Sequence, residues 1–164
     1  MGAWMTKLDG RFNPTLPGAV VVNGGSRHPL SGFLPSAHQP LAIGNPNEGL
    51  RNCEMLRGFN DQSFEKSLAL SNKLDRVFVE KYDLKKVRAY SDMYDDAVRL
   101  MKSQDLKAFD LSEEPEAMRN SYGDDNFGQG VLLARRLVER NVRFVEVQLG
   151  GWDTHQNNFS RVPE

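Results

Sequence analysis

Residues 124–151 read DDNFGQGVLLARRLVERNVRFVEVQLGG, and this stretch decides the fold class. Apolar residues recur at helical spacing from Phe127 to Val138, and Asp124 or Asp125 can cap the first turn of a helix. β-Branched and aromatic residues dominate residues 142–149, which predicts a strand. A helix joined to a strand by a tight turn is half of a β–α–β unit. We therefore predict an α/β protein with a mostly parallel sheet.

A second strand and three more helices are predicted upstream. The run PGAVVVNGG at residues 17–25 is continuously apolar between turn residues, as expected of a buried parallel strand. Apolar periodicity predicts helices over residues 61–82 and 84–102. Ser112, followed by Glu113 and Glu114, predicts the start of a short helix that ends near residue 122, because a hydroxyl cap and early acids suit a helix N-terminus.

Several single residues carry their own expectations. Gly128 and Gly130 lower helix propensity, so we expect a neighbouring backbone to pack closely against them. Asn141 suits a left-handed residue at the helix end. Phe33 and Leu34 are expected to anchor an extended loop to the rest of the protein. Three arginines near the end of this helix are expected to lie on a solvated face: Arg135, Arg136 and Arg140.

Composition divides the chain and excludes some classes of protein. Residues 1–58 contain 9 of the 14 glycines and 6 of the 8 prolines and should be dominated by loops around one strand. Residues 59–123 should be helical, and residues 124–164 form the helix–strand unit. A net charge of −1 argues against nucleic-acid binding. The sequence has one cysteine, Cys53, which excludes an internal disulfide, and it has no apolar run long enough for a membrane span.

The candidate site follows the last strand, where the sequence runs directly into GGWDTH at residues 150–155. Ligands of open α/β sheets bind beyond the carboxyl ends of the strands. Asp153 and His155 could ligate a metal or act as an acid–base pair. Alternatively, Asp153 caps its own loop and His155 is an ordinary surface residue. Two ligands fall short of a zinc site, and His28 and His38 are not expected to contribute.

A family resemblance rests on this same region. The run FGQGVLLARRLVE, the following strand and GGWDTHQNNF, together with SGFLP at residues 31–35 and LPG at residues 16–18, resemble the DUF1501 family of uncharacterised, usually exported bacterial proteins. That resemblance implies a branch of the alkaline phosphatase/sulfatase superfamily, with a three-layer α/β sandwich around a mostly parallel sheet. It implies a divalent metal, zinc or calcium, held by Asp153 and His155. The neighbours that would shape the site are Gly150, Gly151, Trp152 and Thr154.

The resemblance also implies a function and an incomplete site. The family's nucleophile motif and its later metal motifs do not occur in this chain, so we expect an internal fragment of a longer domain. The full-length protein would be exported to the periplasm and would hydrolyse phosphate or sulfate esters with a bound metal. This chain alone should be inactive and only marginally stable. The alternative is a non-catalytic exported binding or surface protein that retains the fold.

Overall fold

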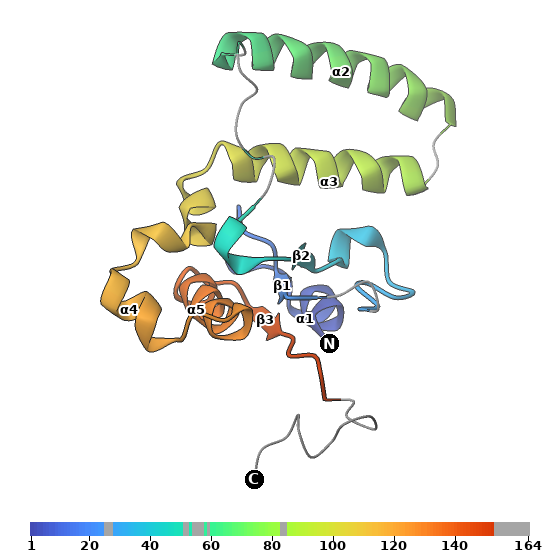
Figure 1. The fold of residues 1–164 in the computed structure, drawn as a ribbon. Coiled ribbons are helices and arrows are strands. Elements are labelled where there is room, and N and C mark those ends of the chain that lie inside the picture. Colours follow the sequence, from blue (N-terminus) through green and yellow to red (C-terminus); the bar gives the residue numbers. More distant parts are fainter. Residues whose placement is uncertain (25–27, 51–52, 54–57, 59, 83–84, 153–164) are drawn as a thin grey trace.

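The computed structural model describes residues 1–24, 28–50, 53, 58, 60–82 and 85–152, with backbone alone for residues 77–79, 82 and 85–90. The protein is a mixed α/β chain built on a small, open, parallel sheet (Figure 1). The order of the strands is β2-β1-β3. The predicted α/β class and the parallel sheet are therefore confirmed. None of the described helices is long and apolar enough to cross a bilayer.

The central strand is β1 (Ala19–Val22), and all four of its residues are buried. It pairs in parallel with β3 (Phe144–Val147), with Ala19 opposite Phe144 and Val22 opposite Val147. On its other side it pairs in parallel with β2 (Leu41–Ile43). Of these three strands, the sequence predicted the first and the last along the chain, β1 and β3. It did not predict β2, because three residues are too short to show a periodic pattern.

Helices cover both faces of the sheet. Helix α5 (Asn126–Glu139) lies on one face, where a Cβ atom added to Gly130 would stand 3.0 Å from Cγ1 of Val147. Helix α1 (Gly2–Asp9), which the sequence analysis did not predict, lies on the other face, where a Cβ atom on Gly2 would meet Ala19 at 2.8 Å. Gly130 is closely packed, but against side chains of β1, β3 and Asn23 and not against the neighbouring backbone that was expected; at Gly128 the expected backbone contact is confirmed. Gly128 is tighter still, since a Cβ there would lie 1.8 Å from the carbonyl oxygen of Tyr122.

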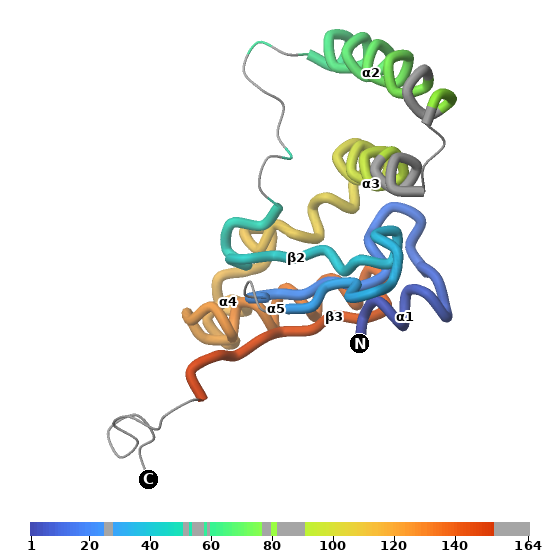
Figure 2. Tube along the Cα trace, turned by 90° about the vertical axis from the view of Figure 1, so that its right-hand side faces the viewer, coloured from blue at the N-terminus to red at the C-terminus, as the bar shows by residue number. Residues whose placement is uncertain are grey.

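The two predicted middle helices are α2 (Asp61–Tyr82) and α3 (Lys85–Met101). They run side by side as a hairpin that stands away from the sheet, with α3 the nearer of the two (Figures 1 and 2). Helix α3 contacts two short 3₁₀ turns, η1 (Ser36–His38) and η3 (Gln104–Phe109). Leu100 at the end of α3 belongs to the main core. The hairpin is thus attached to the sheet through α3 and these turns.

The connection from α3 to α5 differs from the predicted single helix. It contains the 3₁₀ turn η4 (Leu111–Glu113) and the six-residue helix α4 (Glu116–Ser121), in addition to η3. Ser112 does not cap a helix; its backbone N–H donates 2.9 Å to the carboxylate of Asp110, which caps η4. Helix α4 begins after Pro115, whose fixed φ suits a helix start. A further 3₁₀ turn, η2 (Pro46–Glu48), follows β2.

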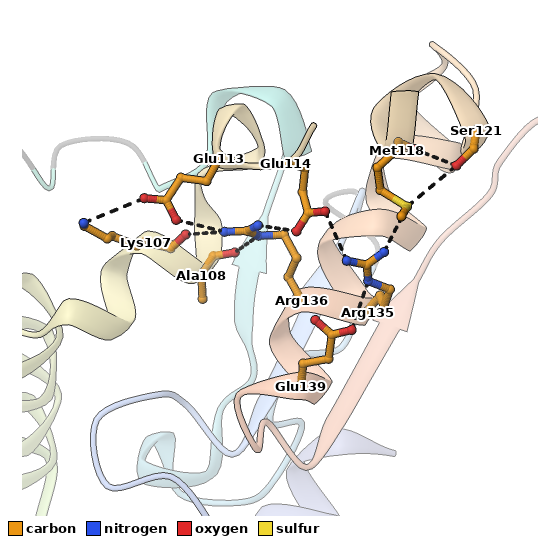
Figure 3. A network of polar contacts seen from close by, with 9 residues as sticks. All are labelled: Lys107, Ala108, Glu113, Glu114, Met118, Ser121, Arg135, Arg136 and Glu139. Atoms are coloured by element: carbon orange, nitrogen blue, oxygen red, sulfur yellow. Dashed lines mark hydrogen bonds and ion pairs between the residues drawn. The ribbon is translucent and has the colours of Figure 1, made fainter. Parts of the chain in front are cut away.

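The prediction of a solvated arginine face is wrong for Arg136, whose side chain is only 6% exposed. Its guanidinium donates to the carbonyl oxygens of Ala108 (3.1 Å) and Lys107 (2.9 Å) and pairs with the carboxylate of Glu114 (Figure 3). Arg135 also pairs with Glu114, at 3.1 Å. This network ties α5 to η3 and to the end of η4.

Two smaller expectations concern backbone and loop residues. Asn141 has φ of 65°, so the left-handed end of α5 is confirmed. Leu34 is buried, as expected of an anchor. Phe33, by contrast, is 84% exposed and does not anchor the loop by burial. Its ring makes a T-shaped contact with that of Trp4, with ring centroids 5.7 Å apart.

Candidate functional site

The carboxyl ends of the three parallel strands meet at one edge of the sheet. Two hydrogen bonds extend the pairing just past the strands: the backbone N–H of Asn23 donates to Ile43 O (2.9 Å), and that of Gln148 donates to Val22 O (3.0 Å). Loops that leave a parallel sheet at this edge are where α/β proteins bind ligands. We therefore built the candidate site from the residues that follow β1 and β3.

Asn23 is held firmly at the end of the central strand. Its backbone is left-handed, with φ of 59°, a conformation that asparagine tolerates better than most residues. Its side-chain amide donates 2.8 Å to the carbonyl oxygen of Asn126, the first residue of α5. Its Oδ1 atom is buried and has no hydrogen-bond partner among the described residues. A buried polar atom without a partner is uncommon and costly, so this oxygen is a candidate ligand atom.

An imidazole–carboxylate pair forms between His28, which follows β1 in the chain, and Glu146 of β3. Nε2 of His28 is 3.4 Å from Oε1 of Glu146 on β3. Nδ1 of His28 accepts a 2.9 Å hydrogen bond from the backbone N–H of Leu30, so the hydrogen of the neutral ring is assigned to Nε2. Both ring nitrogens are therefore engaged. The arrangement orients the ring and the loop and leaves neither nitrogen available as a base.

The carboxylate of Glu146 is stabilised in its charged form. The pKa of Glu146 lies below its usual range, chiefly because the side-chain amide of Gln148 donates to it at 2.9 Å, with a smaller contribution from His28. Burial raises the pKa of Glu146, but this increase only partly offsets the decrease caused by the hydrogen bonds. The lowered pKa favours the charged form of the Glu146 carboxylate, whose side chain alternates with that of Val147 and therefore lies on the face of the sheet opposite to α5.

The exit from β3 keeps the backbone open. An added Cβ at Gly150 or Gly151 would meet no atom of the described residues within 4 Å, and Gly151 has φ of 90°, which most other residues rarely adopt. Trp152 is 78% exposed, and its indole N–H donates 3.1 Å to the carbonyl oxygen of Leu149. The ring is thus tethered by its nitrogen while much of its surface is accessible. Asp153, Thr154 and His155 lie outside the described residues.

The donors present can be compared with what a metal requires. Within the described ranges, no three side chains of the His, Cys, Asp or Glu type lie close enough together to hold an ion. The unpartnered amide oxygen of Asn23 is a hard donor of the kind that suits calcium, and Asp153 and His155 add a carboxylate and an imidazole in sequence. The residue types fit a divalent cation, although this set alone gives three donors at most.

The sequence analysis did not single out Asn23, Glu146 or Gln148. Asn23 was visible only as part of the turn after the first strand, and Glu146 only as a polar residue inside a predicted strand. A charged residue in a strand with apolar neighbours on both sides is a signal that could have identified Glu146. The partnership with His28 is a tertiary contact between segments 118 positions apart, which no local pattern encodes.

Comparison with known proteins gives one family and no individual relative. The family described as "Protein of unknown function (DUF1501)" matches residues 1–164. No curated protein and no solved structure gives a significant match. Since the match extends over the loops of the first third, the three-stranded parallel sheet and the GGWDTH segment alike, the chain belongs to the DUF1501 family.

Proposed function

We propose that the carboxyl edge of this sheet carries a metal-dependent site for the hydrolysis of phosphate or sulfate esters. Asp153 and His155 supply a carboxylate and an imidazole to one metal position. The amide oxygen of Asn23 is a third donor at the same edge. The nucleophile and further ligands belong to segments outside this chain, so the chain alone binds metal weakly and does not turn over substrate.

The observation that carries the proposal is the buried Oδ1 atom of Asn23 at the end of the central strand, which has no hydrogen-bond partner among the described residues. It lies where ligands of parallel sheets bind, and α5 holds the other side of its amide in place. The open backbone at Gly150 and Gly151 follows β3 at the same edge. The reaction class comes from the alkaline phosphatase/sulfatase superfamily, which the resemblance to the DUF1501 family implies.

A divalent metal at such a site would polarise the ester oxygen and neutralise charge that develops on it. The residues of this chain would hold the ion and shape its surroundings. Glu146 of β3 is held in its charged form by its pairing with His28 and Gln148. Trp152, which precedes Asp153 in the sequence, adds an exposed aromatic surface against which an organic part of the ester could lie.

Calorimetric titration of the metal-free chain with Ca²⁺ and, separately, Zn²⁺ tests the proposal. We expect one weak site with a Kd in the range of roughly 0.1–1 mM, since few ligands and a flat edge give low affinity. Asp153→Ala, His155→Ala and Asn23→Ala should each abolish the binding heat. His38→Ala is the matched control and should leave it unchanged.

Two outcomes would overturn this assignment. If neither metal binds, or if binding is the same in Asp153→Ala, the metal site is not at this edge, and the alternative of a non-catalytic exported binding or surface protein is preferred. If the chain hydrolyses p-nitrophenyl phosphate or sulfate and loses this activity in Asp153→Ala, the hydrolase assignment holds but the requirement for further segments is wrong.

A further inference from the structure

An apolar groove runs along the edge of β2 on which no described strand pairs. It encloses about 430 Å³ between β2, η1 and α3. Leu41 and Ala42 both line it, although neighbouring strand residues point to opposite faces of a sheet. The groove therefore follows the edge of the strand and not one of its faces. Leu100 and Met101 of α3 form the opposite wall.

The strand edge in this groove presents backbone groups for a further strand. The carbonyl of Ile43 accepts a hydrogen bond from Asn23, so the backbone of Ile43 faces β1. In a parallel strand the backbone N–H and C=O of alternate residues point to opposite sides. The N–H and C=O of Ala42 consequently point outward, and the sheet order leaves no described strand on that side. An edge of this kind is a template for strand addition.

The charged residues that line the groove are Arg11, Asp92 and Asp96. Of these, Asp92 has no ion-pair partner among the described residues, while its neighbour Asp96 is paired with Arg11 and Arg99. An occupant with a positively charged side chain opposite Asp92 would complement its charge, whereas an acidic one would be repelled.

We propose that the groove binds an extended segment of a partner protein, which adds as a fourth strand along β2. The backbone of the segment pairs with the N–H and C=O of Ala42. Its apolar, β-branched side chains fill the space between β2 and α3, and one lysine or arginine faces Asp92. The volume is within the range typical of ligand sites, about 300–1,000 Å³. This binding is independent of the metal site.

The test uses the whole ¹⁵N-labelled chain and a short capped peptide of alternating valine and threonine with one central lysine. Nuclear magnetic resonance titration should show saturable binding. The amide of Ala42 should exchange with solvent roughly tenfold more slowly in the complex, because it gains a hydrogen bond. The amide of Val22, already inside the sheet, should exchange at its original rate.

Ala42→Pro removes the outward N–H but no hydrogen bond to β1. Edge strands accept proline at positions of this kind. It should weaken peptide binding roughly tenfold, whereas Ala42→Val, which keeps the N–H, should not. A peptide with glutamate in place of lysine should bind severalfold more weakly. In Asp92→Asn the lysine and glutamate peptides should bind with equal affinity. In the control Asp95→Asn, a residue outside the groove lining, the lysine peptide should still bind more tightly.

Folding of Ala42→Pro is checked by the amide protection of Val22 in the same spectra. The proposal is wrong if the lysine peptide does not bind at millimolar concentration, or if Ala42→Pro with an intact sheet binds it as well as the wild type does. It is also wrong if sedimentation shows a dimer that Ala42→Pro dissociates, since the occupant of the edge would then be a second copy of the chain.

Discussion

Replacing Arg136 by leucine should cause a large loss of stability. The substitution leaves the carboxylate of Glu114, which is 11% exposed, without its main cation, and it leaves the carbonyls of Lys107 and Ala108 without their donor. Breaking a buried ion pair costs about 3–5 kcal/mol. Arg135 remains 3.1 Å from Glu114 and offsets part of that cost, so we expect a loss of about 3 kcal/mol.

Urea unfolding followed by far-ultraviolet circular dichroism measures this loss. With a slope of about 2 kcal/mol per molar urea, the midpoint should fall by about 1.5 M. The matched control is Arg99→Leu, which removes a half-exposed arginine paired with Asp96 and should cost less than about 0.5 kcal/mol. The double variant Arg136→Leu/Glu114→Leu should recover part of the loss, because it removes the unpaired charge.

The pH dependence gives a second readout of the same network. The hydrogen bond from Arg136 holds the pKa of Glu114 below its usual range. The associated stability is present above the unfolded glutamate pKa of about 4.3 and is lost as the pH falls through the lower folded value. The difference in unfolding free energy between the wild type and Arg136→Leu should therefore become smaller as the pH falls from about 4.3 through the lower folded pKa. A midpoint for Arg136→Leu within 0.2 M of the wild type at pH 7 would refute the reasoning.

Three further predictions concern α5, β3 and the groove. Gly128→Ala should lower the thermal midpoint more than Gly130→Ala does. The new Cβ at position 128 would meet a backbone oxygen at 1.8 Å, whereas the one at position 130 would meet side-chain atoms at 3.0 Å. Calorimetric scans in which Gly130→Ala has the lower midpoint would contradict this packing. Gln148→Ala should raise the pKa of Glu146 toward that of free glutamate in a carbon-detected titration, and an unchanged value would mean that Gln148 is not its main donor. Burial raises the pKa of the Cys53 thiol, so iodoacetamide should alkylate it more slowly at pH 8 than it alkylates glutathione, and equal rates would count against that burial.

The parts of the fold that the sequence predicted are those with strong local signals. The valine run of β1, the alternating strand β3 and the three long helices each extend over enough residues, or contain enough β-branched side chains, to show their type. Asp125 also behaves as predicted, since its carboxylate accepts hydrogen bonds from the backbone N–H groups of Phe127 and Gly128. Local propensity and tertiary packing agree at these positions.

The parts that were missed depend on distant contacts. Strand β2 has three residues and is a strand only because β1 lies beside it. Arg136 looked like part of a solvated face, since helical spacing places it near Arg135 and Arg140, and its burial depends on carbonyls contributed by η3. The candidate site shows the same limit: the GGWDTH segment was evident from the sequence, whereas the orphaned oxygen of Asn23 depends on α5 packing against the sheet.

The register of the sheet has a consequence for how the chain is made. Ala19 pairs with Phe144, a separation of 125 positions, while β1 and β2 are joined within about twenty residues. During synthesis β1 and β2 can pair early, and the α2–α3 hairpin can form as a local unit. The edge of β1 that pairs with β3 then stays exposed until β3 has emerged from the ribosome. Translation speed and chaperone access during that interval should decide how much of the newly made protein reaches its native topology.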